Sequence, residues 1–279
     1  MSFLSIITVN LNNKEGLHKT LISVFNQEYN DYEYIVIDGG SKDNSKEILI
    51  EFSKATLKDF KWISEPDSGI FEAMNKGIRL ATGEYLLFLN SGDFLVNNNV
   101  LDDVFGKTYT ADFLLGRCNL SKNGVVVHTT SPPHKLTFGY LYTTGLAHQA
   151  TFIKREMFER FGLYREDFRF NSDIEFWYRT IVLRNCSTET LETVISDYNM
   201  DGITSKLHFS ESYQNEMQEI FSDPLLQLFI PDYEAWAVER KGMNVMYWAK
   251  SKKLVYSLVL ALFNIAKCFS KIRRSLWAA

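Results

Sequence analysis

The sequence predicts an α/β protein whose central sheet is mainly parallel and is covered by helices. Three observations support this fold class: short apolar runs alternate with amphipathic segments in the N-terminal third, these runs have strand length, and polar or acidic residues follow them. Strands that alternate with helices at this spacing form βαβ units, in which neighbouring strands are parallel. We therefore expect the carboxyl ends of the strands to meet at one edge of the sheet.

The predicted elements follow one another in a regular order. The first strand covers residues 5–10, and the second starts at Tyr34 and ends at Asp38, before a glycine turn. The pattern further predicts helices at 17–25, 45–52 and 70–80, and strands at 60–64 and 85–89. Later in the chain, residues 113–117 and 125–129 are expected to pair as a hairpin around Lys122-Asn123-Gly124.

The most informative segment is Gly-Glu-Tyr-Leu-Leu-Phe-Leu-Asn-Ser-Gly-Asp at residues 83–93. Here an apolar strand runs into a small turn that ends in the carboxylate of Asp93. In α/β sheets, ligands bind outside the carboxyl ends of the strands. We therefore expect Asp93 and Asp38 to lie at the same edge, where a metal-bound phosphate fits.

Six polar motifs, taken in their order along the chain, resemble a known family. They are the strand ending in Asn10, Asp38-Gly-Gly-Ser-x-Asp43, Glu65-x-Asp67-x-Gly69, Asn75-x-Gly77, Ala81-x-Gly83-Glu84 and Asn90-Ser-Gly-Asp93. Over about residues 3–205 the chain resembles the family 2 glycosyltransferases of the GT-A fold, of the type that builds bacterial surface polysaccharides such as O-antigen, capsule or colanic-acid-like polymers. The resemblance implies transfer of a hexose from a nucleotide diphosphate to a hydroxyl group.

Composition limits the partners and the compartment. A net charge of -4 provides no basic surplus for binding nucleic acid. The three cysteines, Cys118, Cys186 and Cys268, lack metal-ligand spacing and fit a reducing compartment. Since the N-terminus runs directly into a strand, we expect no signal peptide and a cytoplasmic protein.

The chain is expected to form one catalytic domain with a helical extension. Pro132-Pro133 interrupts the pattern after the hairpin and marks the change from a nucleotide-sugar half, residues 1–130, to an acceptor half, residues 131–205. Because a GT-A sheet is shared between such halves, we treat residues 1–205 as one domain. Residues 206–279 are expected to form the C-terminal helical extension.

A divalent cation, Mn²⁺ or Mg²⁺, is the cofactor that the resemblance implies, bound to the diphosphate. The family commonly has Asp-Ser-Asp-Asp where this chain has Asn90, Ser91, Gly92 and Asp93, so Asp93 is the expected principal metal ligand beside a turn that contacts the sugar donor. His148 is the candidate second ligand. Alternatively, Asp93 is a turn or cap residue and His148 a hydrogen-bonded histidine at the start of a strand.

The nucleotide pocket is also carried over from the family. The residues expected to contact the nucleoside are Thr8, Val9, Asn10, Asp38, Asp67 and Lys76. A carboxylate accepts the imide N–H of uracil, so UDP is the expected nucleotide. The family's frequent Asp-Asp pair appears here as Asp38-Gly39, which removes the second carboxylate. In the alternative interpretation, Asp67 and Lys76 are solvated surface charges.

The segment Phe-Asn-Ser-Asp-Ile-Glu at residues 170–175 matches the part of the family that carries the general base. Asp173 is the expected base, at the start of a helix that favours its charge; alternatively it only caps this helix, and Glu175 is the base. A single base permits direct displacement with inversion at the anomeric carbon. The loop Asp201-Gly-Ile-Thr-Ser205 resembles the family's segment near the acceptor, or is only a turn.

The C-terminal extension carries basic residues on both sides of an apolar run at residues 254–266. These residues are Lys250, Lys252, Lys253, Lys267, Lys271, Arg273 and Arg274. As a helix the run would span roughly 20 Å, shorter than the ~30 Å hydrocarbon core. We expect an interfacial helix on the cytoplasmic face of the inner membrane, or else a helix packed on the catalytic domain or on a second subunit.

Three functions are compatible with these features. The first is a peripheral membrane glycosyltransferase that extends an oligosaccharide linked to a lipid such as undecaprenyl diphosphate. The second is a nucleotide-sugar-binding protein with little turnover, suggested by the depleted acidic motif. The third is a nucleotidyltransferase, which would normally carry a glycine-rich, basic phosphate loop instead of Asn10-Leu-Asn-Asn13.

Overall fold

The computed structural model describes residues 3–55, 58–200, 210–237, 250–252, 255–258 and 260–262. It divides the chain into two compact units, residues 1–220 and 221–279. The expected domain boundary at residue 205 and the loop at residues 201–205 lie outside the described residues, as do residues 254, 259 and 263–266 of the apolar run. The first unit contains the whole sheet.

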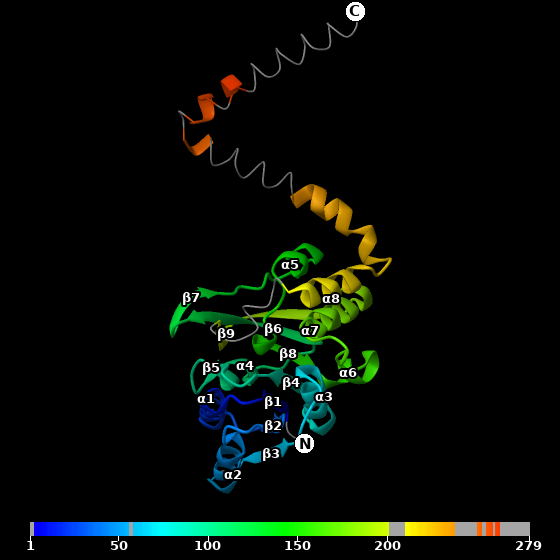
Figure 1. Ribbon diagram of the computed structural model, residues 1–279. Helices are drawn as coiled ribbons and strands as arrows, with labels where there is room; N and C mark the ends of the chain where they lie inside the picture. The colour runs from blue at the N-terminus through cyan, green and yellow to red at the C-terminus, as the bar shows by residue number, and fades with distance from the viewer. Residues whose placement is uncertain are drawn as a thin grey trace, which may run out of the picture. The chain divides into compact units, whose positions relative to one another are not determined.

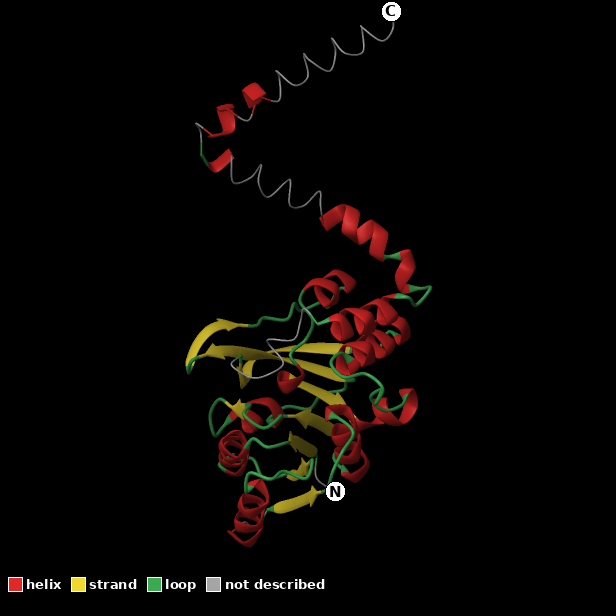
Figure 2. Ribbon diagram, in the orientation of Figure 1, coloured by secondary structure: helices red, strands yellow, loops and turns green. Residues whose placement is uncertain are grey.

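Nine strands in the described part of the chain form one sheet in the order β3-β2-β1-β4-β8-β6-β9-β5, with β7 paired to β6 (Figures 1 and 2). Their bounds are β1 Leu4–Asn10, β2 Tyr32–Asp38, β3 Asp59–Ser64, β4 Tyr85–Phe88, β5 Phe94–Leu95, β6 Phe113–Lys122, β7 Val125–Thr129, β8 Thr151–Lys154 and β9 Thr188–Asn199. The first four strands by sequence, β1 to β4, are parallel to one another. Strand β8 is antiparallel to β4 and to β6, so both predicted halves share one mixed sheet.

The helices cover both faces of this sheet, as Figure 1 shows for α1 and α2 on one side and α3 on the other. Their bounds are α1 Lys14–Phe25, α2 Ser45–Ala55, α3 Ile70–Leu80, α4 Val100–Phe105, α5 Phe138–Thr143, α6 Arg155–Phe161, α7 Ser172–Trp177 and α8 Glu211–Phe221, with short helices η1 His148–Ala150, η2 Tyr178–Val182 and η4 Leu226–Leu228. The α/β class and the elements predicted between residues 5 and 89 are therefore confirmed.

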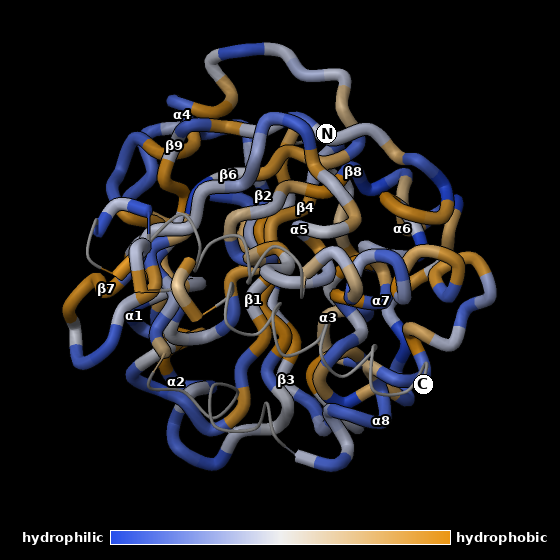
Figure 3. Tube along the Cα trace, turned by 90° about the horizontal axis from the view of Figure 1, so that it is seen from above, coloured by the Kyte–Doolittle hydropathy of each residue, from blue (hydrophilic) through white to orange (hydrophobic). Residues whose placement is uncertain are grey.

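Two apolar clusters, one on each face, hold the sheet between the helices. Along β1, Leu4 and Ile6 join the cluster packed by α1, α2 and α4, whereas Ile7 and Val9 join the cluster packed by α3, α6 and α7. A strand covered on both faces needs apolar residues at successive positions. This requirement explains the continuous apolar runs in the sequence, and Figure 3 shows hydrophobic residues concentrated along the central strands.

Two of the glycines in the sequence motifs permit close packing at the sheet. A Cβ at Gly77 would lie 2.5 Å from a methyl carbon of Ile7, so glycine lets α3 approach β1. A Cβ at Gly83 would lie 2.6 Å from the peptide nitrogen of Ser5. Asn75 is buried and bonds the peptide of Tyr164 through both ends of its amide, at 2.9 and 3.0 Å. These motif residues therefore serve the fold.

The predicted hairpin forms with a different register. Strand β7 pairs with residues 119–122 at the far end of β6, not with 113–117, which pair with β8 and β9. Asn123 and Gly124 have φ angles of 51° and 74°, as a two-residue turn of type I′ requires. Such a turn joins the residues that directly flank it, so β6 has to extend to Lys122.

Residues 221–279 form the second unit, and it is described only in part. Residues 226–228 and 230–237 are helical. In the stretches that the structure describes, no helix is long and apolar enough to cross a membrane.

Candidate active site

The carboxyl ends of β1, β2 and β4 form the floor of the candidate site. Strand β1 lies between β2 and β4, and the chain proceeds first toward β2 and β3 and then returns to β4 on the other side. At such a point the connections leave in opposite directions and open a crevice outside the strand ends, where α/β proteins bind ligands. Asn10, Asp38 and the turn at residues 90–93 all stand at this edge.

Asp38 is buried and organises its own turn. Its Oδ1 accepts hydrogen bonds from the Asn10 amide at 2.7 Å and the Ser41 hydroxyl at 2.5 Å. Its Oδ2 accepts from the Ser41 peptide at 3.0 Å and the Ser64 hydroxyl at 2.7 Å. With 0% of its surface exposed, this carboxylate holds the ends of three strands together in the described conformation.

Thr8 and Val9, also predicted to contact the nucleoside, are buried within β1. The Thr8 hydroxyl lies 2.9 Å from the hydroxyl of Tyr34, and the Val9 carbonyl accepts the Ser91 peptide N–H at 3.0 Å. The side chains of both residues therefore face the interior. Any contact they make with a ligand has to involve the backbone.

Asp67 lies over Gly39. A Cβ at residue 39 would approach Asp67 Oδ2 to 2.5 Å and a methyl carbon of Leu11 to 3.3 Å, so the glycine makes room for both side chains. Partial burial raises the pKa of Asp67, and the charge of Lys76 opposes this rise. Lys76 itself pairs with Glu65 at 3.0 Å and Glu72 at 3.3 Å.

The turn at residues 90–93 is fixed by the start of α1. The Asn13 amide donates to the Ser91 carbonyl at 2.8 Å, and Gly92, with a φ of 109°, donates its N–H to the Thr20 hydroxyl at 3.0 Å. That hydroxyl donates in turn to the Asp93 carbonyl at 2.7 Å. Since glycine adopts this φ without strain, Gly92 lets the turn close against the helix.

Asp93 is a buried carboxylate, with 5% of its surface exposed. Burial raises its pKa to about 7, while the charge of His148 and the peptide N–H groups of Asn199 and Asn90 act in the opposite direction. Asp197 adds to the rise, because β5 pairs Phe94 directly with Asp197 of β9. A nearby cation would favour the charged form of Asp93.

His148 connects this turn to the candidate base. Its Nδ1 lies 3.4 Å from Asp173 Oδ2, and its Nε2 lies 3.2 Å from the amide nitrogen of Asn90. Burial lowers the pKa of His148, but the charges of Asp173 and Asp93 outweigh burial and leave the pKa above its ordinary value. Three predicted site residues from distant parts of the sequence, Asn90, His148 and Asp173, therefore meet here.

Asp173 is the second residue of α7, and the helix N-cap is Asn171. The Asp173 Oδ1 accepts the Ile174 N–H at 2.9 Å, which leaves Oδ2 toward His148. Glu175, the alternative base, holds the guanidinium of Arg179 at 2.9 Å from both of its oxygens. Of the two acidic residues, Asp173 is the one in contact with the rest of the site.

The turn at residues 90–93 offers few ligands of its own to a divalent cation, and they are oxygens. Among the described residues, no three His, Cys, Asp or Glu side chains gather into a metal centre. Asp93 offers carboxylate oxygens, and Asn90 Oδ1 is buried without a hydrogen-bond partner in the described part of the chain. Mg²⁺ and Mn²⁺ prefer oxygen ligands, and Mg²⁺ is often bound by one or two carboxylates together with phosphates and waters.

Sequence reasoning missed two buried carboxylates near these residues. Asp197 lies in β9 beside Asp93, and its Oδ2 accepts the Ser121 hydroxyl at 2.7 Å. Glu216 lies in α8 and bonds the loop before α7. The available signal was weak, since each is one of three acidic residues on its strand or helix, and the local pattern does not separate the buried one from the two exposed ones.

Proteins that are similar to this chain in sequence are glycosyltransferases. A profile described as Glycosyl transferase family 2 matches residues 5–117. An uncharacterized glycosyltransferase of Mycobacterium tuberculosis is 30% identical over 208 residues, which cover 72% of this chain and 76% of that protein.

Solved structures share the fold at low sequence identity. Staphylococcus aureus TarS in complex with UDP-GlcNAc has a TM-score of 0.61 and 18% identity, over 79% of this chain and 65% of that one. A mannosyltransferase of Pyrobaculum calidifontis in complex with GDP-Man and Mn²⁺ has a TM-score of 0.58 and 15% identity, over 98% of this chain and 82% of that one. These likenesses place the chain in the GT-A fold.

Proposed function

Because the chain belongs to the family 2 glycosyltransferases and has their GT-A fold, we propose that it transfers a hexose from UDP to a hydroxyl of a lipid-linked oligosaccharide, with inversion. One observation carries this proposal. The contacts from Asn90 through His148 to Asp173, at 3.2 and 3.4 Å, join the phosphate edge of the sheet to a carboxylate that can act as a base. A transferase has to bring the leaving diphosphate and the general base to the same sugar carbon.

In the proposed reaction, the acceptor hydroxyl loses its proton to Asp173 as its oxygen bonds to the anomeric carbon. The bond from that carbon to the diphosphate oxygen breaks at the same time, and UDP leaves with the electron pair. Attack from the side opposite the leaving group inverts the carbon. Nδ1 of His148 holds the Asp173 carboxylate in place from the side of the turn.

Asp93 would hold a divalent cation, together with His148 when its Nε2 exchanges the contact with the Asn90 amide for the cation. When bound, Mn²⁺ or Mg²⁺ supplies positive charge to the departing diphosphate. Histidines that bind metals usually donate their other ring N–H to a carboxylate, and Asp173 provides that partner for His148. The Mn²⁺ in the complex of the Pyrobaculum mannosyltransferase supports this choice of cation.

For the nucleobase of the donor, Asp67 is the proposed partner of the uracil imide N–H. Its carboxylate lies over Gly39 and remains partly accessible, whereas Asp38 has no exposed surface. The UDP-GlcNAc complex of TarS supports a uridine donor, although the GDP-Man complex shows that this fold also takes guanosine. Lys76, in its ion pairs with Glu65 and Glu72, is proposed to face the phosphates from the edge of the pocket.

The acceptor and location are proposed from the C-terminal extension. Seven of its basic residues flank an apolar run that is too short to span a bilayer but suited to an interfacial helix on anionic lipid. Such attachment would keep the enzyme at the cytoplasmic face of the inner membrane, beside an acceptor carried on a lipid diphosphate. The product would then serve a surface polysaccharide.

Thermal unfolding with nucleotides tests the proposal. We expect UDP with Mn²⁺ to raise the unfolding temperature more than GDP, CDP or dTDP, because a ligand stabilises the state that binds it. Enzymatic release of UDP from a UDP-sugar in the presence of an acceptor should follow. UDP binding without any transfer would favour the second candidate, a nucleotide-sugar-binding protein, which the single carboxylate left in the turn at residues 90–93 suggests.

A further inference from the structure

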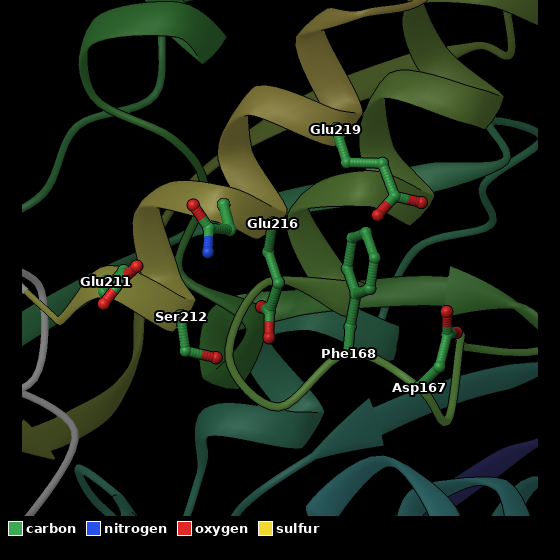
Figure 4. A pocket seen from close by; sticks show the side chains of 7 residues that line it. Asp167, Phe168, Glu211, Ser212, Glu216 and Glu219 are labelled. Atoms are coloured by element: carbon green, nitrogen blue, oxygen red, sulfur yellow. The ribbon is translucent and has the colours of Figure 1, made fainter.

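Glu216 is a buried carboxylate of α8 with no part in the site described so far. Only 8% of its surface is exposed. Figure 4 shows its side chain extending from α8 toward the loop that carries Phe168 and leads to α7. A buried carboxylate needs partners that offset its loss of hydration, so the question is what this one binds.

The partners are consecutive peptide groups of that loop. Oε1 of Glu216 accepts the N–H of Arg169 at 2.7 Å, and Oε2 accepts the N–H groups of Phe170 and Asn171, each at 3.0 Å. The side-chain amide of Asn171 donates to Oε2 as well, at 3.1 Å. Hydrogen bonds to an ionised acceptor are about twice as strong as neutral ones. Four of them converge on this side chain.

These bonds end two residues before the candidate base. Asn171 is the N-cap of α7, yet its Oδ1 accepts no capping bond and is buried without a hydrogen-bond partner among the described residues. Its amide nitrogen donates to Glu216 and to the Tyr213 carbonyl of α8, each at 3.1 Å. The start of α7 is therefore placed by α8 and not by its own cap. Asp173 lies in the first turn of α7, so its position depends on these hydrogen bonds.

Packing alone does not hold the loop on this side. A pocket of about 410 Å³ opens between the loop and α8, lined by Asp167 and Phe168 of the loop and by Ser212 and Glu219 of the helix (Figure 4). Arg165 crosses to Glu219 at 2.6 Å, but the two side chains of that ion pair are 34% and 53% exposed. Exposed pairs contribute little. The four hydrogen bonds to Glu216 are therefore the largest group of contacts between the loop and α8, beside the Asn171–Tyr213 hydrogen bond and the ring contact of Phe170 with Tyr213.

We propose that Glu216 is a positioning residue that sets the location of Asp173 through the loop at residues 169–171. This role rests on the proposed function, since it assigns Glu216 to the base of that reaction. An enzyme loses about 10²-fold in rate when a reacting group is misplaced by about 1 Å. Loss of the hydrogen bonds to Glu216 is therefore expected to lower kcat and to leave nucleotide binding unchanged.

Glu216→Gln tests this role, with Glu211→Gln as the matched control on the exposed start of the same helix. The amide nitrogen of glutamine would face peptide N–H groups that now meet an oxygen. We expect kcat to fall about 10- to 100-fold, with the dissociation constant of UDP within twofold of wild type. Glu211→Gln should leave both values unchanged.

Two further measurements separate positioning from general destabilisation. Amide hydrogen exchange of residues 169–173 should accelerate in Glu216→Gln while the rest of the sheet stays protected. In an Asp173→Asn background, adding Glu216→Gln should cause no further loss of kcat, because the base that it positions is already removed. Glu216→Asp, which keeps the charge but withdraws it by one methylene, is the second variant if the glutamine form does not fold.

The inference is wrong if Glu216→Gln turns over at the wild-type rate, or if it lowers kcat equally in the presence and absence of Asp173. Unchanged exchange at residues 169–173 would also overturn it. A wild-type protein without transfer activity would instead overturn the proposed function and the positioning role with it, while exchange would still report whether Glu216 holds the loop. The two failures are thus distinguishable.

Discussion

Glu33 provides a stability prediction at the end of the sheet opposite the candidate site. Its side chain, at the start of β2, has no exposed surface. It accepts the Ser5 hydroxyl at 2.6 Å and the Thr82 peptide at 2.5 Å, and it pairs with Lys61 at 2.6 Å. Burial raises the pKa of Glu33, but Lys61 and these hydrogen bonds outweigh it and bring the pKa down to about 2.

The size of the effect follows from that pKa. The ordinary pKa is 4.5, and each pKa unit of difference between the folded and unfolded states corresponds to about 1.36 kcal/mol. The ionised carboxylate therefore contributes about 3 kcal/mol to the stability of the folded state at pH 7. A lowered pKa stabilises the folded state above pH 4.5, and this contribution is lost as the pH falls toward 2. At pH 3 about 1.4 kcal/mol would remain.

Urea unfolding of Glu33→Gln measures this contribution. We expect its free energy of unfolding to lie about 3 kcal/mol below wild type at pH 7 and less than half as far below at pH 3. Glu47→Gln, on the exposed face of α2, is the control and should stay within about 0.5 kcal/mol. A loss below about 1 kcal/mol at pH 7, or the same loss at both pH values, would refute the reasoning.

Three predictions concern activity. Asp93→Ala should abolish transfer and weaken Mn²⁺-dependent UDP binding, because Asp93 is the carboxylate left in the turn; full wild-type activity in EDTA would remove the metal role. Asp173→Asn should bind UDP normally but lose about 10²- to 10⁴-fold in kcat, the range for a general base; a loss within about tenfold would transfer the role to Glu175 or another group. Removal of residues 250–279 should release the protein from anionic liposomes and lower activity on a lipid-linked acceptor far more than on a short soluble one. A full-length protein that does not sediment with such vesicles at low salt, and a truncated form that unfolds or changes its oligomeric state, would instead identify the tail as a packing or dimerisation helix.

Local pattern was sufficient for the parallel half of the sheet. Strands β1 to β4 and helices α1 to α3 lie where the alternation of apolar runs predicts them, because strands buried on both faces consist of apolar residues. The hairpin was placed correctly but paired in the wrong register. Strands β5 and β9 were not predicted: β5 has two residues, and β9 alternates irregularly between buried and exposed positions. Both exist because they pair with partners distant in sequence.

The sequence by itself determined which polar groups end the strands. Asn10, Asp38 and the turn at residues 90–93 follow apolar runs, and parallel strands bring such ends to one edge in any protein of this class. Local pattern therefore sufficed to predict that these groups share one edge of the sheet, and to predict the family resemblance.

Only the tertiary structure decided which groups act on one another. His148 is 58 residues from Asn90 in sequence, and Glu216 is 45 residues from Asn171, yet each pair is in hydrogen-bond contact. No periodicity encodes such pairs, because the first depends on how η1 lies against the turn after β4, and the second on how α8 lies against the loop before α7. For the same reason the Asp38 carboxylate is enclosed by four hydrogen bonds from three residues, while Asp67 stays partly accessible over Gly39. Burial and contact are properties of the folded chain, and they separate residues that look equivalent in sequence.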